Sequence, residues 1–157
     1  MKHLYIHPEL CTGCRQCSIA CSLKHFGENN PKKAAITVIR DEFEGYEFPL
    51  VCLQCDDPLC VKMCPQNAVT WVNGIIKRDK ERCMGCKLCA VICPFSAITV
   101  LGKELVQCDL CDGDPMCVKV CATKAIEYVE ETAELSKRRK ELVEKILHES
   151  HYLVATG

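Results

Sequence analysis

Short apolar stretches alternate with polar turns along most of the chain. Residues 69–72 and 75–77 flank Asn73-Gly74, the dipeptide that type I′ turns favour, so this segment is predicted to form a β-hairpin. Residues 98–101 and 104–106, joined by Gly102-Lys103, predict a second hairpin. The pattern therefore predicts small antiparallel sheets.

A second pattern recurs around cysteines. Cys64, Cys93 and Cys121 are each followed by three turn residues, an alanine and a β-branched residue that begins a short strand. The three residues before each of these cysteines, and before Cys21, suit one helical turn. The predicted turns are 18–20, 61–63, 90–92 and 118–120. Residues 36–40 predict one more strand, with a turn at 41–45.

The pattern changes after residue 129. Acidic residues precede the basic run Lys137-Arg138-Arg139-Lys140, an order that suits the helix dipole. Apolar residues fall at helical spacing, namely Leu135, Leu142, Val143, Ile146 and Leu147. Residues 130–150 are predicted to be helical, and the apolar stripe either packs on its own domain or docks a partner.

Composition adds cysteine as the dominant feature. Hydrophobic residues, with cysteine counted among them, make up 48% of the 157 residues, and 16 of the hydrophobic residues are cysteine. The aliphatic core is therefore thin, and we expect the fold to depend on bound metal. Neither a secretory signal nor a long apolar run is present, so we expect a cytoplasmic protein without a membrane span.

The cysteines fall into four runs of nearly one spacing. The first and third read C-x2-C-x2-C-x3-C, and the other two widen the middle gap. This is the bacterial ferredoxin spacing, in which three thiolates bind one cluster and the fourth reaches a neighbouring cluster. The runs are Cys11-Cys14-Cys17-Cys21, Cys52-Cys55-Cys60-Cys64, Cys83-Cys86-Cys89-Cys93 and Cys108-Cys111-Cys117-Cys121.

Sixteen thiolates suffice for four [4Fe–4S] clusters, so the spacing predicts a carrier of single electrons. A disulfide scaffold and a zinc module are the rival interpretations, and four copies of one spacing favour neither. Sixteen thiolates and four cluster cores would bring the net charge to about −9, which argues against nucleic acid. Gly13 and Gly85 should allow close backbone approach to a cluster, whereas the histidines are expected at the surface or in packing.

All sixteen cysteines together resemble the four-cluster iron–sulfur subunits of redox complexes. That group includes subunits of formate dehydrogenases, dimethyl sulfoxide and nitrate reductases, formate-linked hydrogenases, carbon monoxide dehydrogenases and tungsten aldehyde oxidoreductases. The resemblance covers residues 3 to about 128, although Ser22 and Ala122 replace the proline that follows the last cysteine of a run.

The resemblance implies an α+β fold of two pseudo-symmetric bacterial-ferredoxin-like units, one inserted in the other, plus a C-terminal helix. The outer dicluster unit would comprise residues 1–30 and 98–128, the inner unit residues 31–97, and the helical tail residues 129–157, with residues 31–50 as a covering loop. The implied ligand sets are Cys11, Cys14, Cys17 with Cys121; Cys108, Cys111, Cys117 with Cys21; Cys52, Cys55, Cys60 with Cys93; and Cys83, Cys86, Cys89 with Cys64.

The expected function is electron transfer by a non-catalytic subunit, between a larger catalytic subunit and another redox partner. The compact size favours a tungsten or molybdenum aldehyde oxidoreductase as the catalytic partner. Carbon monoxide dehydrogenase, formate dehydrogenase and hydrogenase remain alternatives, as does a free polyferredoxin. The second partner could be a ferredoxin, a flavin-containing subunit or a further copy of the chain.

Overall fold

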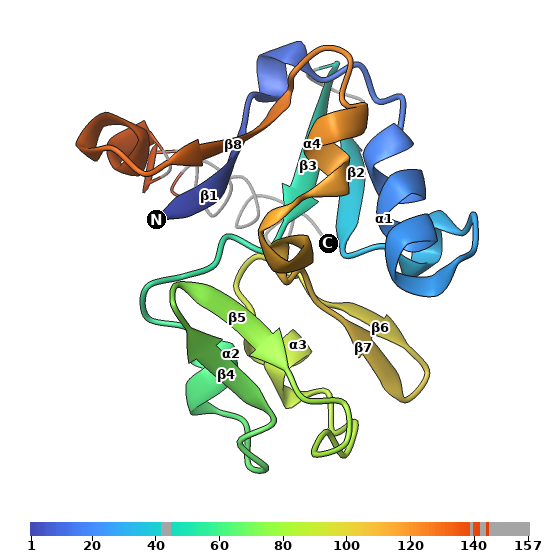
Figure 1. The fold of residues 1–157 in the computed structure, drawn as a ribbon, viewed down its shortest axis with the longest axis vertical. Coiled ribbons are helices and arrows are strands. Elements are labelled where there is room, and N and C mark those ends of the chain that lie inside the picture. The colour runs from blue at the N-terminus through green and yellow to red at the C-terminus, as the bar shows by residue number, and fades with distance from the viewer. Residues whose placement is uncertain (42–44, 139, 142–143, 145–157) are drawn as a thin grey trace, which may run out of the picture.

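The computed structural model describes residues 1–41, 45–138, 140–141 and 144. Within this part of the chain, short helices accompany four antiparallel sheets of two strands each, an α+β fold (Figure 1). The strand pairs are β1 (Lys2–Ile6) with β8 (Ile126–Glu130), β2 (Ile36–Asp41) with β3 (Tyr46–Val51), β4 (Val69–Val72) with β5 (Ile75–Arg78), and β6 (Thr99–Leu101) with β7 (Glu104–Val106).

Each predicted helical turn before a fourth cysteine is confirmed. The helices are α1 (Gln16–Phe26), α2 (Leu59–Lys62), α3 (Leu88–Ile92) and α4 (Met116–Val120), with 3-10 turns η1 (Pro8–Leu10), η2 (Pro31–Lys33) and η3 (Leu110–Gly113). Pro65 and Pro94 follow the fourth cysteine of their runs, and α2 and α3 end before them, because the residue before a proline disfavours helical backbone. No proline follows Cys21 or Cys121; α4 still ends before Cys121, whereas α1 continues to Phe26 and is capped by Gly27 at φ 68°.

Both predicted hairpins are confirmed, as β4–β5 and β6–β7. Asn73 and Gly74 have φ angles of 51° and 79°, positive as a type I′ turn requires. The predicted strand at 36–40 is β2. Its partner β3 was not predicted, because Pro49 interrupts the strand pattern. Residues 42–44 of the predicted turn lie outside the described residues.

The buried side chains form two cores. The first joins β1, β2, β3, α1, α4 and β8, in the upper part of Figure 1, and the second joins β4, β5, α2 and α3 below it. The first core contains Leu4, Ile6, Cys17, Cys21, Ala34, Ala35, Ile36, Val38, Phe48, Val51, Val106, Leu110, Cys117 and Ile126. The second contains Cys52, Cys60, Val69, Ile76, Cys89, Ala97 and Ile98.

The hairpin β2–β3 packs in the first core. The division drawn from the sequence assigned residues 31–97 to the inner unit, whereas Ile36, Val38, Phe48 and Val51 are buried with the first and last strands of the chain. Segment 31–50 was expected to be a loop that covers a buried centre. It is largely a hairpin, and its apolar face lies beside cysteines of the first core.

Helical structure begins again at residue 133. Residues 133–138 are helical, and the Thr132 hydroxyl accepts a hydrogen bond from the backbone N–H of Leu135 at 3.3 Å, as a helix N-cap does. The predicted stripe residues Leu142, Val143, Ile146 and Leu147 lie outside the described residues. Over the part of the chain that is described, no helix has the length and apolar character needed to cross a membrane.

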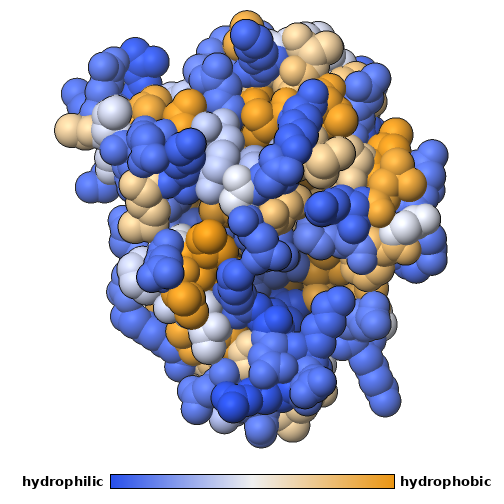
Figure 2. All heavy atoms as spheres, viewed as in Figure 1, coloured by the Kyte–Doolittle hydropathy of each residue, from blue (hydrophilic) through white to orange (hydrophobic). Residues whose placement is uncertain are grey.

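Hydrophilic side chains cover most of the face in Figure 2, with separate hydrophobic patches between them. Exposed hydrophobic residues gather in α3 and the loop before it, where Val91 is 83% exposed and Met84 64%. Leu59 and Met63, in and just after α2, are also exposed, and α2 lies against α3. The second unit thus carries apolar surface on its two helices.

Candidate metal centres

The loop between the first and second cysteine has the same backbone turn in all four runs. The second intervening residue has a left-handed backbone in every loop, with φ of 66° at Gly13, 49° at Gln54, 71° at Gly85 and 57° at Leu110. This conformation costs a residue other than glycine about 1–2 kcal/mol. Two loops use glycine there. In the other two the side chain is only 1% exposed, so its burial offsets the strain.

Two cysteine groups lie in the first core, and each combines the first run with the last. The first cavity, called site A, is lined by Cys11, Cys14, Cys17 and Cys121. The second, called site B, is lined by Cys21, Cys108, Cys111 and Cys117. Val38 and Pro49 of the β2–β3 hairpin also line site A, and Ile36 and Val51 line site B. The hairpin therefore shields both groups from solvent.

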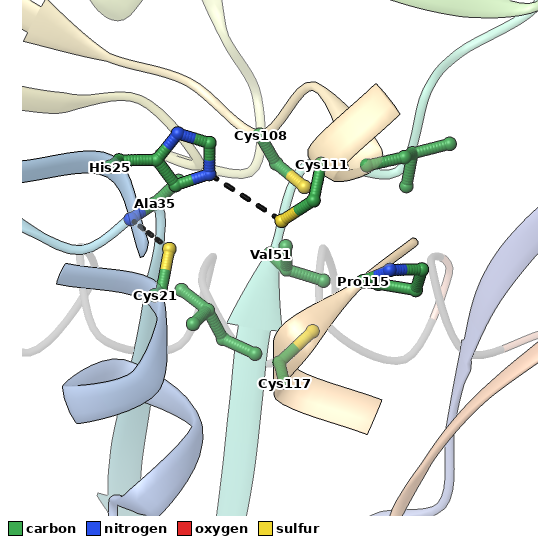
Figure 3. Close-up of a pocket in the computed structure, with 10 residues that line it drawn as sticks. Cys21, His25, Ala35, Val51, Cys108, Cys111, Pro115 and Cys117 are labelled. Atoms are coloured by element: carbon green, nitrogen blue, oxygen red, sulfur yellow. Dashed lines mark hydrogen bonds between the residues drawn. The ribbon is translucent and has the colours of Figure 1, made fainter. Parts of the chain in front are cut away.

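Figure 3 shows how the cysteines of site B converge from two directions. Cys21 projects from α1, whereas Cys108, Cys111 and Cys117 come from η3, α4 and the segment before them. The backbone N–H of Ala35 donates to the sulfur of Cys21 at 3.3 Å. The fourth cysteine of the first run thus points away from the other three of its run.

The second core holds the remaining two groups. Site D is a cavity lined by Cys64, Cys83, Cys86 and Cys89. The backbone N–H of Ala68 donates to the sulfur of Cys64 at 3.3 Å. We assign Cys52, Cys55, Cys60 and Cys93 to site C, because they are the four cysteines that line none of these three cavities, and Gln107 lies beside the sulfurs of Cys52 and Cys60. The cavities at sites A, B and D thus group twelve cysteines as the resemblance implies.

Burial makes these thiols weaker acids than an exposed cysteine. Burial is the main cause that raises the pKa of Cys17 to about 11 and the pKa of Cys52 and Cys117 to about 12, while Cys108 is raised well above its usual range. Without bound metal these thiols are neutral at pH 7. Metal binding requires thiolates, so loading these sites releases protons and supplies the positive charge that buried sulfur lacks.

The donor set fits [4Fe–4S] clusters. Each site offers four cysteines, the ligand type and number such a cluster takes, in a mainly apolar cavity at A, B and D. Backbone N–H groups already point at sulfur, as the surroundings of iron–sulfur clusters do. No disulfide joins any of the sixteen described cysteines, which argues against a disulfide scaffold.

Packing places the four sites next to one another. Cys17 of site A and Cys117 of site B are buried in the first core. Cys108 of site B packs against both cores, and the second core buries Cys52 of site C. Cys60 of site C and Cys89 of site D are buried together in the second core. We therefore order the sites A, B, C, D.

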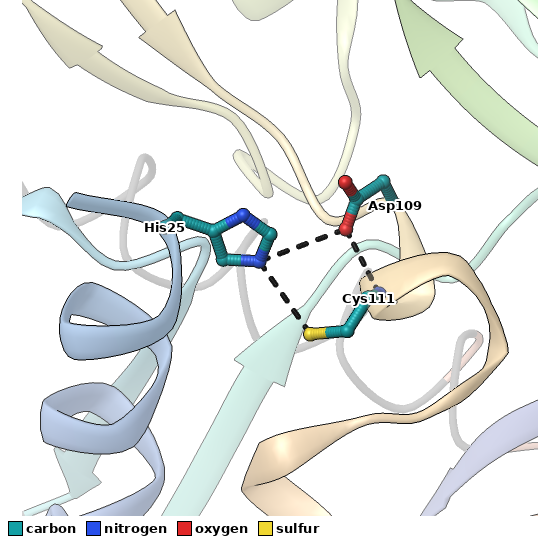
Figure 4. Close-up of side chains that lie close together, drawn as sticks. All are labelled: His25, Asp109 and Cys111. Carbon is teal, nitrogen blue, oxygen red and sulfur yellow. Dashed lines mark hydrogen bonds and ion pairs between the residues drawn. The ribbon is translucent and has the colours of Figure 1, made fainter. Parts of the chain in front are cut away.

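His25 lies against site B, in a contact that the sequence did not suggest. Its Nε2 is 3.5 Å from the sulfur of Cys111 and 3.7 Å from Oδ1 of Asp109 (Figure 4). That Asp109 oxygen accepts the backbone N–H of Cys111 at 2.9 Å. These groups surround the Cys111 sulfur, so we interpret them as its hydrogen-bond environment and not as a separate metal site.

Five residues beside the cysteines were missed from the sequence. His25, Arg78 and Gln107 approach sulfur only through the tertiary fold, and no local pattern marks them. Gln54 and Leu110 could have been found, because they stand where the first and third runs have glycine.

Comparisons with known proteins give the same chemistry. Residues 10–69 match the 4Fe-4S dicluster domain, and residues 76–99 match the 4Fe-4S binding domain. The chain is 32% identical over 174 residues to formate hydrogenlyase subunit 2 of Escherichia coli, with 85% of each protein covered. It is 39% identical over 122 residues to the polyferredoxin-like subunit of an aliphatic sulfonate oxidoreductase of Pyrococcus furiosus, covering 75% of this chain and 70% of that one.

A solved structure of the active-site complex BamBC of benzoyl coenzyme A reductase with benzoyl-CoA shares the fold. One of its chains aligns with a TM-score of 0.50 and 21% identity, over 100% of this chain and 98% of that chain. The sequence matches and the four-cysteine sites agree on the cofactor. The chain therefore belongs to the ferredoxin-like family of electron-transfer proteins that carry several [4Fe–4S] clusters.

Proposed function

We propose that this protein is a non-catalytic subunit that carries single electrons along four [4Fe–4S] clusters, held at sites A, B, C and D. Such a cluster accepts and releases one electron, which is the chemistry it supplies when bound. The observation that carries the proposal is that four groups of four cysteines lie next to one another in one chain, and that each group combines cysteines of two runs. The residues that would hold each cluster are the four cysteines that define its site.

We further propose the ferredoxin-like arrangement in which one dicluster unit is inserted in another. Two separate cores support it, as does the pairing of β1 with β8, which returns the chain to its start. Sites A and B would belong to the outer unit, and sites C and D to the inner one. Reduced cysteines fit a cytoplasmic location.

The partner we propose is a larger catalytic oxidoreductase subunit. Relatives named as subunits of formate hydrogenlyase and of an aliphatic sulfonate oxidoreductase support this. A tungsten or molybdenum aldehyde oxidoreductase is our first candidate, with formate-linked and carbon monoxide enzymes next. Exposed Cys14 at site A and exposed Cys86 at site D suit electron entry and exit at the two ends of the series.

Double substitutions test how the cysteines are grouped. Cys64→Ala with Cys86→Ala removes two ligands of one site, from two runs. Cys55→Ala with Cys64→Ala removes two ligands of one run, from two sites. We expect the first pair to lose no more iron and sulfide than Cys64→Ala alone, and the second pair to lose about twice as much, given about four irons per cluster. The opposite pattern would mean that each run closes on its own cluster.

The unsubstituted chain should contain about sixteen iron and sixteen sulfide when purified anaerobically. Bound zinc without sulfide would instead establish that the chain is a zinc module. Purification from the native source should yield a complex with a catalytic subunit. A lone monomer with all its clusters would favour a free polyferredoxin.

A further inference from the structure

Arg78, the last residue of β5, reaches between sites C and D. Its guanidinium donates to the backbone carbonyl of Leu105 and, at 3.0 Å, to the side-chain oxygen of Gln107. The same nitrogen that bonds Gln107 is 3.9 Å from the sulfur of Cys89, a residue of site D. Its Nε is buried and has no hydrogen-bond partner among the protein atoms of the described chain.

Gln107 extends this contact to site C. Its amide nitrogen lies 3.8 Å from the sulfur of Cys60 and 4.0 Å from the sulfur of Cys52. The orientation of the amide follows from Arg78, because a guanidinium only donates and must face the amide oxygen. The NH2 group of Gln107 is therefore turned toward two sulfurs of site C.

The positive charge of Arg78 has no carboxylate partner in the described part of the chain. Two nearby carboxylates, Asp79 and Asp112, form ion pairs with Arg82 and Lys77 instead. A half-buried charge needs compensation, and beside the two oxygens that accept its hydrogen bonds the guanidinium faces the sulfur of Cys89.

We propose that Arg78, together with Gln107, raises the reduction potentials of the clusters at sites C and D. Reduction adds one negative charge to a cluster, and a cation or an N–H donor at its sulfurs stabilises the reduced state more than the oxidised state. Arg78 and Gln107 thus adjust the reduction potentials of the clusters at sites C and D from one position between these two sites. This inference rests on the proposed function, because it requires clusters at all four sites.

The test is a redox titration of the full, cluster-loaded chain, followed by electron paramagnetic resonance. Arg78→Gln should lower the midpoint potentials of sites C and D by at least about 59 mV each. For a one-electron couple, this shift corresponds to a tenfold change in the equilibrium constant. Arg78→Lys keeps the charge and should shift them less. Gln107→Leu should lower the potential of site C. Cys14→Ser and Cys86→Ser, at exposed ligands, mark the signals of sites A and D.

Arg138→Gln is the matched control, since it removes the same charge from an exposed side chain paired with Glu134, away from all four sites. It should leave all potentials unchanged. Unchanged potentials in Arg78→Gln with full iron and sulfide content would overturn the inference and leave the proposed function intact, as would an equal shift at all four sites.

If Arg78→Gln fails to retain its clusters, the midpoint potentials of Arg78→Lys and Gln107→Leu test the inference instead. A site C potential that is unaltered in a fully loaded Gln107→Leu protein would then overturn the inference. If the unsubstituted chain takes up fewer than four clusters, the proposed function itself fails, and this inference falls with it.

Discussion

Gln54 forms a buried bridge between the two cores, and its replacement by leucine should weaken the whole fold. Its side-chain nitrogen donates to the carbonyl of Cys108 at 2.8 Å, and its oxygen accepts the backbone N–H of Ile76 at 2.7 Å. Gln54 and Ile76 are each 1% exposed, so water cannot replace the lost partner of the Ile76 N–H, whereas the Cys108 carbonyl belongs to a partly buried residue. Leucine keeps a similar volume, which limits the effect mainly to hydrogen bonding.

A buried group left without a partner costs about 1–3 kcal/mol, so Gln54→Leu should lose roughly that much through the Ile76 N–H. That is a large part of the roughly 5–15 kcal/mol by which a domain is stable. Hydrogen exchange at the Ile76 amide, followed by mass spectrometry on the loaded protein, measures this directly. Exchange should become at least about 30-fold faster if opening costs 2 kcal/mol less.

Gln66→Leu is the control for Gln54→Leu, because Gln66 is exposed. A surface substitution of this kind should change stability by no more than about 0.5 kcal/mol. If Gln54→Leu exchanges like the control, the bridge does not hold the two cores together, and the hydrogen bonds of Gln54 have no energetic weight.

Two further predictions concern positive φ angles. A Cβ at Gly85 would lie 2.8 Å from the carbonyl oxygen of Lys103, whereas a Cβ at Gly102 would meet nothing within 4 Å, and both residues have positive φ. Gly85→Ala should therefore lower the thermal midpoint and the iron content more than Gly102→Ala, and equal losses would show that the close approach is unimportant. Lys124 is exposed with φ 55°, so Lys124→Gly should raise the free energy of unfolding by up to about 1 kcal/mol. Asn67→Gly, at φ 48°, should raise it less, because asparagine tolerates this backbone, and denaturation of both variants checks the order.

The elements that the sequence predicted are those governed by neighbouring residues. Asn73-Gly74 determines a turn whichever tertiary structure surrounds it, and the helical turn before Cys93 ends at a proline. The strands β1 and β3 were missed for different reasons. β1 pairs with a strand near residue 128, which no local pattern reveals, and β3 contains Pro49, which is tolerated because a two-stranded sheet leaves one edge of each strand unpaired.

The candidate sites were predictable in their cysteines and not in their surroundings. The ligand sets came from the resemblance, and the spacing alone left the grouping open. The contacts of His25 with Cys111 and of Gln107 with Cys60 depend on side chains brought together from residues 86 and 47 positions apart. Such contacts follow from packing, which neither composition nor periodicity encodes.

The return of the chain to its first strand has a consequence for assembly during synthesis. Residues 52–93 contain every cysteine of sites C and D, so these sites can close while later residues are still on the ribosome. Sites A and B cannot, because Cys11 and Cys21 await partners from residues 108–121. Until then, the first run of thiols and half of a core are exposed to oxidation and aggregation. With the proposed ligand sets, sites C and D can therefore form before sites A and B, and the first run of cysteines is the last to gain its partners.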